Sequence, residues 1–364
     1  MKTTNSKDLV KVNQILPIMQ EHFGKNMNLA RIKLIALLLH ALCVVQTVSL
    51  HKIADAMPTA VDKDSNLRRL QRFFAKYVLD LDIVARMIFS LLPVKTGLVL
   101  SMDRTNWKFG EFNINILMLG ITYKGIAFPL IFSLLPKRGN SNWEERCKIM
   151  ERFIRLFGAD CIDCLVADRE FIGKEWIGWL NSYPIRYYIR IRQNFWIVKP
   201  STGERIRAWW LFNGLKVGQE KFYYKIFLHK GEFIYLAGSR IKNADGVPEL
   251  QILICFNRPQ DAVLTYKKRW EIETAFKAMK SSGFNIEDTH MRDTKRIARL
   301  VAMVCLALVK DSKTRKKGKV ACQVWFGGDF NNTSASDLYP KIRCFQIFVM
   351  YLRKEYKINP ECHY

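Results

Sequence analysis

The hydrophobic positions along the chain change their period near residue 97. Before that point they recur at three- and four-residue spacing, which predicts helices over residues 9–92. Pro58 and the polar stretch Asp62–Asn66 are expected to separate two short helices, of which the second is rich in arginine. This pattern predicts either a helix-turn-helix that places arginines in a DNA groove, or an ordinary helical bundle with a solvated basic face. The arginines are Arg68, Arg69 and Arg72.

Residues 1–95 are therefore expected to form an all-α N-terminal domain, which is a DNA-binding domain if the helix-turn-helix interpretation is correct, and the pattern after it differs. Short, nearly continuous apolar runs predict strands buried on both faces of a sheet. The expected strands are Leu98–Met102, Phe112–Thr122, Gly125–Leu135 and Cys161–Ala167, with a helix at Asn142–Phe157. Residues 96–192 are thus predicted to be an α/β unit.

Residues 193–258 predict a β-strand-rich insertion without helices, because short strand-like runs alternate there with glycine-containing turns. The expected strands are Phe195–Val198, Glu204–Leu211, Phe222–Leu228, Phe233–Ala237 and Leu250–Phe256. The last segment, 259–364, begins with a predicted helix at Leu264–Ser281 and a second, apolar helix at Ile297–Val309. Six basic residues in the ten of Lys310–Lys319 predict an exposed loop.

Composition narrows the class of protein. Hydrophobic residues make up 49% of the 364 residues, which is enough for a sizeable core. Nine cysteines at irregular spacing indicate free thiols in a reducing compartment, so we expect a cytoplasmic protein. The longest apolar run, Leu34–Val45, falls short of the roughly 20 residues that a bilayer requires, and the polar start of the chain predicts no signal peptide. We therefore expect no membrane association.

The net charge of +25 points to a polyanionic partner. The excess of lysine and arginine is present in each of the four segments defined above. A charge spread over several domains suits a long nucleic acid better than a single basic tail would. DNA is accordingly the leading candidate partner, ahead of an anionic membrane surface.

Two predicted strands end in the same way, with aspartate followed by arginine. Asp103 follows Leu98–Met102, and Asp168 follows Cys161–Ala167. If the strands are parallel neighbours, both carboxylates emerge at the edge where open α/β sheets bind ligands. Carboxylates that have lost hydration need a compensating charge. Ion pairs with Arg104 and Arg169 would supply it, and so would a divalent ion such as Mg²⁺.

The predicted helix at Leu264–Ser281 carries a line of polar residues beside its apolar face. At 100° per residue, they fall within an arc of about 60°. They are Tyr266, Arg269, Glu273 and Lys280. This line is either a solvated face with local ion pairs, or a row of functional side chains that the helix aims at the two aspartates.

These residues resemble a known family. Tyr266, Arg269, Glu273 and Lys280 match the Tyr-Arg-Glu-Lys signature of the DDE transposases of bacterial insertion sequences, in the group called insertion-sequence family four. Met102–Thr105 and Val166–Phe171 resemble that family's first and second aspartate blocks. The β-rich stretch between them and Glu273 is similar to its insertion. The resemblance spans roughly residues 30–310.

The resemblance implies a ribonuclease-H-like catalytic core, interrupted by the β-rich insertion, that cuts and pastes DNA. Asp103, Asp168 and Glu273 would bind two Mg²⁺ ions, with Mn²⁺ as a possible substitute. Tyr266, Arg269 and Lys280 would hold the DNA strand near the cut, and Arg104 is placed with these contacts. The expected partners are double-stranded DNA and, when two element ends are paired, a second copy of the chain, in the bacterial nucleoid.

Several points stay open at this level. A DNA-binding protein without catalysis and a standalone nuclease with the same core are alternatives to a transposase. Some aromatic residues are candidates for stacking on a displaced base, although core packing is the alternative for each. They are Trp270, Trp209, Trp210, Phe233 and Tyr235. Cys161 and Cys164 lack a second pair at zinc-finger spacing, so both are interpreted as buried strand residues.

Overall fold

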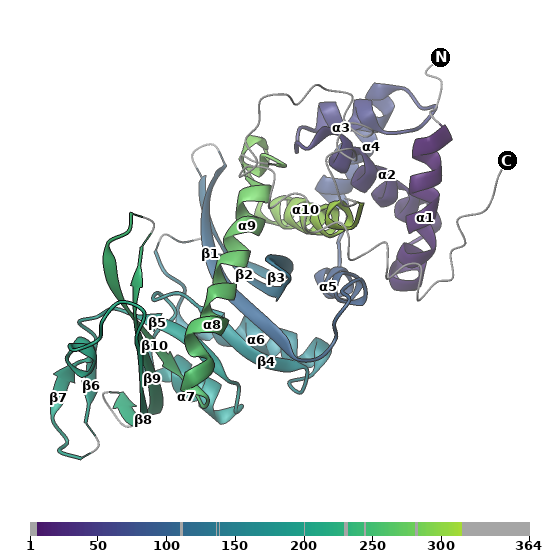
Figure 1. Ribbon diagram of the computed structural model, residues 1–364. Helices are drawn as coiled ribbons and strands as arrows, with labels where there is room; N and C mark the ends of the chain where they lie inside the picture. Colours follow the sequence, from purple (N-terminus) through teal and green to yellow (C-terminus); the bar gives the residue numbers. More distant parts are fainter. Residues whose placement is uncertain are drawn as a thin grey trace.

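The N-terminal part of the chain is a group of helices (Figure 1). The computed structural model describes residues 6–109, 112–135, 137, 139–199, 201–228, 232–243, 245–280 and 283–314. The first helices are α1 (Ser6–Phe23), α2 (Leu29–Val45), α3 (Leu50–Ala56), α4 (Lys63–Lys76) and α5 (Leu81–Ser90). A distant helix, α10 (Thr294–Thr314), packs against α2, α4 and α5, because its apolar residues are buried on several sides.

The start of α4 differs from the sequence prediction. Asp62 caps this helix, its side chain accepting a hydrogen bond from the backbone N–H of Ser65 at 2.9 Å. The polar stretch Asp62–Asn66 therefore begins the helix instead of breaking it, since aspartate and serine are favoured where the first backbone N–H groups lack partners.

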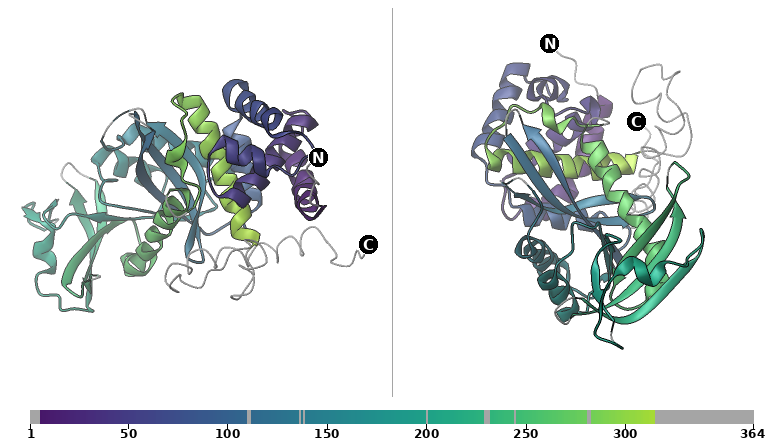
Figure 2. Two further views of the ribbon diagram at one scale, coloured as in Figure 1. Left: turned by 90° about the horizontal axis from the view of Figure 1, so that it is seen from above. Right: turned by 90° about the vertical axis from the view of Figure 1, so that its left-hand side faces the viewer.

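One sheet of ten strands runs through the rest of the described chain (Figure 2). The strands are β1 (Leu98–Phe109), β2 (Phe112–Tyr123), β3 (Ile126–Leu135), β4 (Ile162–Ala167), β5 (Tyr187–Ile191), β6 (Trp196–Val198), β7 (Arg205–Arg207), β8 (Glu220–Leu228), β9 (Phe233–Lys242) and β10 (Pro248–Cys255). Their order is β3-β2-β1-β4-β5-β10-β9-β8-β6-β7. β4 is parallel to β1 and to β5, and the other pairs are antiparallel.

Local sequence explains several of these elements. The β2–β3 turn was predicted correctly, because Lys124 and Gly125 both adopt positive φ (51° and 89°), as a tight hairpin turn requires. Helix α6 (Trp143–Phe157) begins with a capping box between Asn142 and Glu145. Together with α7 (Lys174–Ser182), it makes the helical connections between β3, β4 and β5.

The β-rich segment differs from its prediction in one respect. The expected strand Glu204–Leu211 stops at Arg207, and Ala208–Phe212 forms a 3₁₀ helix, so a short helix does interrupt this region. Its strands continue the central sheet, since β10 pairs with β5. Figure 2 shows these strands at the end of the molecule opposite the N-terminal helices.

The region after β10 is less regular than the predicted single helix. Two 3₁₀ turns, Pro259–Asp261 and Lys267–Arg269, flank α8 (Ala262–Tyr266), and α9 (Trp270–Met279) follows. Leu264, expected on the packing face, is 73% exposed. After a further 3₁₀ turn at Ile286–Asp288, α10 extends to Thr314, so the first residues of the expected loop Lys310–Lys319 are helical, and residues 315–319 lie outside the described residues.

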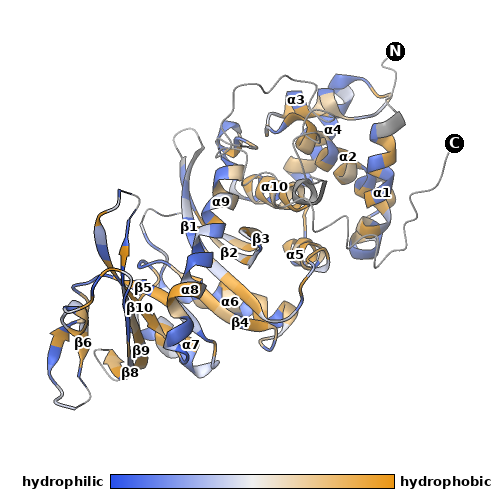
Figure 3. Ribbon diagram, viewed as in Figure 1, coloured by the Kyte–Doolittle hydropathy of each residue, from blue (hydrophilic) through white to orange (hydrophobic). Residues whose placement is uncertain are grey.

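The central strands consist largely of hydrophobic residues, drawn in orange in Figure 3. Their side chains are buried on both faces of the sheet. Val99, Cys164 and Val166 pack with Val263 and Tyr266 of α8 on one face. The residues between them, including Leu100, Leu165 and Ala167, join the main core on the other face. The strands are therefore buried on both sides, as the continuous apolar runs predicted.

Among the described residues, no single helix is both long and apolar enough to cross a bilayer. Helices α2 and α3 reach the required length and apolar character only when taken together, and they are bent by 104° at their junction.

Candidate active site

The two aspartates lie side by side because β1 and β4 are parallel neighbours. Their pairing ends at Met102 opposite Ala167, so Asp103 and Asp168 follow in register. Side chains alternate between the faces of a strand, which puts both aspartates on the face that Val99, Cys164 and Val166 share with α8. The condition for bringing the two carboxylates together, a parallel pair of neighbouring strands, is thus fulfilled. Asp103, however, lies in the middle of the 12-residue β1, not at a strand end.

The reason for this difference is that β1 continues beyond β4 as a long hairpin with β2. Residues Asp103–Asn106 are polar, and the hydrophobic pattern stops there, although the backbone ladder to β2 runs on to Phe109. The carboxylate of Asp103 therefore projects from a strand that is paired on one side only.

Helix α8 and the 3₁₀ turn after it bring the predicted polar line onto the two aspartates. The Tyr266 hydroxyl donates to Asp168 Oδ1 at 3.4 Å. Arg269, 5% exposed, places Nη1 2.8 Å from Glu273 Oε1 and 3.7 Å from Asp103 Oδ2. Arg269 also interacts electrostatically with Asp168. The structure thus collects all three acidic residues around one guanidinium group.

Burial makes the Asp103 carboxylate hard to ionise. It raises the pKa of Asp103 to about 6, against the opposing effects of a hydrogen bond from the backbone N–H of Arg104 (2.7 Å) and of the charge of Arg269. The nearby carboxylates Glu170 and Glu273 raise this pKa further. A carboxylate whose ionised form is disfavoured by burial and by nearby acids is a place where an added cation is favoured.

The donor set fits a hard divalent cation. Three carboxylates surround the single charge of Arg269, and Arg269 Nε is buried without a hydrogen-bond partner among the described residues. Carboxylate oxygens are the ligands that Mg²⁺ and Mn²⁺ prefer. As the described side chains stand, no three His, Cys, Asp or Glu residues form a closed metal cluster. The sequence left an ion pair and a metal ion as alternative ways to compensate the aspartates. In the structure, Arg269 forms the ion pairs at the same place where a metal ion would bind.

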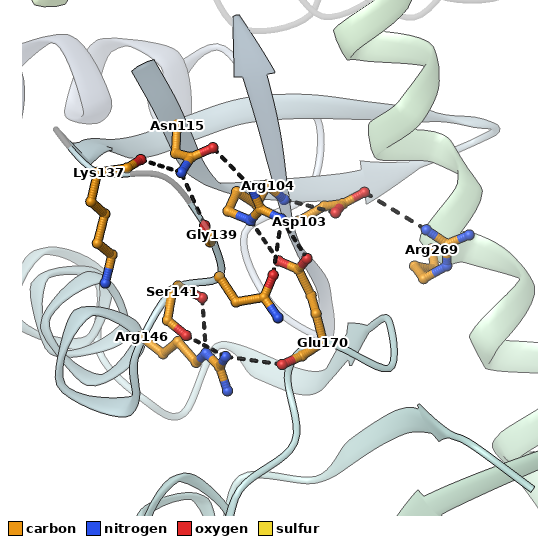
Figure 4. A network of polar contacts seen from close by, with 10 residues as sticks. Asp103, Arg104, Asn115, Lys137, Gly139, Ser141, Arg146, Glu170 and Arg269 are labelled. Atoms are coloured by element: carbon orange, nitrogen blue, oxygen red, sulfur yellow. Dashed lines mark hydrogen bonds and ion pairs between the residues drawn. The ribbon is translucent and has the colours of Figure 1, made fainter. Parts of the chain in front are cut away.

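Arg104 and Arg169 were the cations expected to pair with the aspartates. Arg169 is instead exposed, and the Arg104 side chain turns to the opposite face of β1, where its fork holds Glu170 (Figure 4). Only the backbone N–H of Arg104 contacts Asp103.

Lys280 is the last member of the predicted line and lies farther along. It follows the end of α9 with non-helical dihedral angles, so the expected helical geometry does not reach it. Its ammonium group donates to the backbone oxygen of Asn106 at 3.1 Å and lies 3.9 Å from Glu287 Oε1. Lys280 therefore ties the segment after α9 to the far half of β1.

The N-terminal arginines lie on α4. Arg68 and Arg72 are exposed, while Arg69 is half-buried and donates to Asn66 Oδ1 at 3.3 Å. Two of the three side chains are thus accessible for contacts with a partner. Their role in DNA binding stays a prediction.

The candidate stacking residues fall into two groups. Trp210, Phe233 and Trp270 are 61%, 49% and 58% exposed, whereas Trp209 and Tyr235 are half-buried against the core. The guanidinium of Arg269 lies 4.5 Å from the centre of a Trp270 ring.

Trp196 is one of the exposed aromatic residues that sequence reasoning did not single out. It is 39% exposed, and the Arg207 guanidinium lies 3.6 Å from its ring centre. The sequence carries no local signal for this contact, because only the pairing of Arg205–Arg207 with Trp196–Val198 brings the arginines to the ring.

Comparison with known protein families gives a match to the part of the chain that carries Asp168 and the site residues after it. The family described as the transposase DDE domain matches residues 144–310. The matched range contains Asp168 and Glu273, as well as Tyr266, Arg269 and Lys280, while Asp103 precedes it. Among curated proteins, no similar sequence is found.

Proposed function

We propose that the protein is the DNA transposase of a bacterial insertion sequence, of the Tyr-Arg-Glu-Lys group of family four. The observation that carries this proposal is the convergence of Asp103, Asp168 and Glu273 on Arg269 from three separate elements. The match to the transposase DDE domain over residues 144–310 supports transposase function and a DNA-cleaving activity independently of this geometry.

The catalytic core would be ribonuclease-H-like. In support, strands β1 to β5 stand in the order β3-β2-β1-β4-β5, with the first three antiparallel and the last two parallel to β1. Strands β6 to β10 would be the insertion, since they extend this sheet at the β5 edge before the chain returns to the carboxylates through α8.

Asp103, Asp168 and Glu273 would hold the metal. Two bound Mg²⁺ ions, or Mn²⁺ in their place, supply an activated water and a positive charge beside the leaving oxygen in phosphoryl transfer. The water oxygen forms a bond to phosphorus as the bond to the 3′ oxygen breaks, and the released 3′-OH can attack a second strand or the target. These steps are cleavage and strand transfer, in a cut-and-paste sequence.

The side chains around the carboxylates would position the DNA. Tyr266 holds Asp168 through its hydroxyl group, which keeps the carboxylate oriented. Arg269 neutralises Asp103 and Glu273 in the present arrangement, and its planar fork suits a phosphate once another cation takes over that role. Lys280, 31% exposed, would contact the backbone beside the cut as a point charge.

The rest of the chain would bind the DNA that flanks the cut. Arg68 and Arg72 on α4 would contact element ends, and pairing of two ends would bring two copies of the chain together. The net charge of +25 supports binding of several phosphates at once. Binding should accordingly weaken steeply as salt rises.

The proposal is tested with purified protein and a labelled duplex that carries the DNA flanking its own coding sequence. Incubation with Mg²⁺ should give nicks at defined end positions and then strand-transfer products on a denaturing gel. Cleavage without end preference or transfer would indicate a standalone nuclease instead. Specific binding without any cleavage in Mg²⁺ or Mn²⁺ would indicate a regulator and contradict the proposal.

A further inference from the structure

Arg104 is the centre of a polar network on the face of β1 opposite Asp103 (Figure 4). Its Nε donates to Glu170 Oε1 at 3.0 Å and its Nη2 to Glu170 Oε2 at 2.9 Å. The same guanidinium donates to Asn115 Oδ1 at 2.8 Å and to Asn140 Oδ1 at 3.2 Å. A forked pair of this kind is stronger and more directional than a single contact.

The partners of Arg104 are themselves held in place. Asn115, on β2 and 1% exposed, donates to the backbone oxygens of Lys137 (2.5 Å) and Gly139 (3.0 Å). The loop after β3 is thereby fixed to the same network. Since Asn115 is buried and uses both its carbonyl and its amide, it has one preferred orientation, which in turn fixes Arg104.

Arg146, on α6 and 4% exposed, holds the loop after β4 from the other side. It donates to the backbone oxygens of Glu170 at 2.9 Å and Ile172 at 3.3 Å. Its remaining contacts, to Ser141 O and Ser141 Oγ, anchor it to the loop that precedes α6. The segment that carries Asp168 is thus attached at its backbone by Arg146 and at the Glu170 side chain by Arg104.

This network begins where the backbone ladder between the two aspartate strands ends. The last β1–β4 pair is Met102 with Ala167. Beyond it, no further β1–β4 pair joins the described residues, and Arg104 and Glu170 are the next side chains to connect the two segments. Asp103 directly precedes Arg104, and Asp168 stands two residues before Glu170.

We propose that Arg104 and Glu170 are positioning residues that fix the separation of Asp103 and Asp168 for metal binding, and that Arg104 does not contact DNA. The inference rests on the proposed function. It replaces the expectation that Arg104 is a DNA contact, because its fork is occupied and points away from the face that carries Tyr266 and Arg269. Removing residues that orient metal ligands typically lowers metal affinity by about 10- to 100-fold.

The test measures Mn²⁺ affinity of the full chain by electron paramagnetic resonance. Arg104→Lys keeps the charge and loses the fork, and Glu170→Gln keeps the shape and loses the charge. Both should weaken Mn²⁺ binding about tenfold, while DNA affinity and its salt dependence stay at the wild-type values.

The matched control is Arg186→Lys, which disturbs another arginine–carboxylate pair, with Asp163 of β4 (3.0 Å), at the opposite end of the same strand. It should change the melting temperature as the other variants do and leave Mn²⁺ affinity unaltered. A second control, Asp103→Asn, should lose Mn²⁺ binding.

Wild-type Mn²⁺ affinity in both Arg104→Lys and Glu170→Gln would overturn the inference, as would a loss of Mn²⁺ affinity in Arg186→Lys of equal size. Weaker DNA binding with a reduced salt slope in Arg104→Lys would make Arg104 a phosphate contact instead. If Asp103→Asn binds Mn²⁺ as tightly as the wild type, the proposed function itself fails, which is a distinct result.

Discussion

Two basic regions of the molecule use arginine in opposite ways. One region, called here the carboxylate edge, holds Asp103, Asp168 and Glu273, and there Arg104 and Arg269 each contact carboxylates. The other region, called here the tip, is the end of the sheet formed by β6 and β7. At the tip, Arg205 and Arg207 lie over the partly exposed ring of Trp196, at 5.0 and 3.6 Å from its centre. The sequence singled out Arg104 and Arg269 but not Arg205 and Arg207, and it did not show that the two pairs have different partners.

This difference indicates which arginines can bind DNA without first breaking an ion pair. A guanidinium that lies over an exposed ring gains only about 0.5–1 kcal/mol there, and it keeps donors for phosphates. One that is forked onto a carboxylate must first give up that partner. We infer that the carboxylate edge performs the chemistry and that the tip contributes affinity. Four changes sharpen or break this division.

Neutralising the acids should have the largest effect. Asp103→Asn, Asp168→Asn and Glu273→Gln should each lower the rate of strand cleavage on the order of a thousand-fold. Each change removes a negative charge that would hold the metal, and the metal would stabilise the negative charge that develops on the phosphoryl group in the transition state. Gel-based cleavage at saturating DNA measures this. Glu204→Gln at the tip is the control and should cleave normally. Full activity in any of the three variants would remove that residue from the site.

Removing Arg269 should separate metal binding from cleavage. Without its charge, Asp103 and Glu273 lose their internal counter-ion. Arg269→Gln should therefore bind Mn²⁺ about tenfold more tightly in the absence of DNA, by the usual effect of a close charge. The rate at which this variant cleaves DNA should nonetheless fall, because the guanidinium that would hold the phosphate is missing. Metal titration checks the first effect, and weaker Mn²⁺ binding would contradict the role of counter-ion.

The tip should affect affinity alone. Arg205→Ala combined with Arg207→Ala should weaken DNA binding several-fold and reduce the salt slope by about two, because each arginine neutralises one phosphate. The cleavage rate at saturating DNA should not change. Fluorescence anisotropy over a salt series measures both quantities. An unchanged slope would remove the tip from the DNA-binding surface.

Stability should show the smallest effect. The pKa of folded Asp103, about 6, lies above its ordinary value of 3.8, so protonation stabilises the fold at low pH, and that contribution is lost as pH rises through about 6. Asp103→Asn is neutral throughout. Without metal at pH 7.5 it should be more stable than the wild type by about 3 kcal/mol, or a few degrees in melting temperature. The difference should vanish near pH 4, and calorimetry at both pH values tests it.

Local patterns in the sequence predict much of the fold. The Lys124–Gly125 turn, the Asn142 cap and the apolar runs of β2, β3 and β4 depend on neighbouring residues, so they can be recognised one segment at a time. Parallel pairing of β1 with β4 was the condition under which the two aspartates would meet, and the assembled sheet fulfils it.

Non-local contacts explain what the sequence did not predict. Polar residues after Met102 ended the predicted strand, although pairing with β2 carries β1 to Phe109. The 3₁₀ turn at Lys267–Arg269 breaks a pattern that is typical of one helix. Arg104 and Glu170 are 66 residues apart, and no local signal pairs them. The sequence analysis recognised the polar line on the helix. The contacts of Tyr266 and Arg269 with the aspartates form only when these side chains are buried, and burial is determined by the assembled fold.

The central claim, that Asp103, Asp168 and Glu273 form one divalent-metal site, is tested most directly by metal-directed backbone cleavage. Fe²⁺ substituted for Mg²⁺ reduces added hydrogen peroxide to hydroxide and a hydroxyl radical, which cuts the chain beside the ion, and ascorbate returns the resulting Fe³⁺ to Fe²⁺. We expect fragments ending near residues 103, 168 and 273, which excess Mg²⁺ suppresses and Asp103→Asn abolishes. Cleavage at other positions, or the same pattern in Asp103→Asn, would contradict the claim.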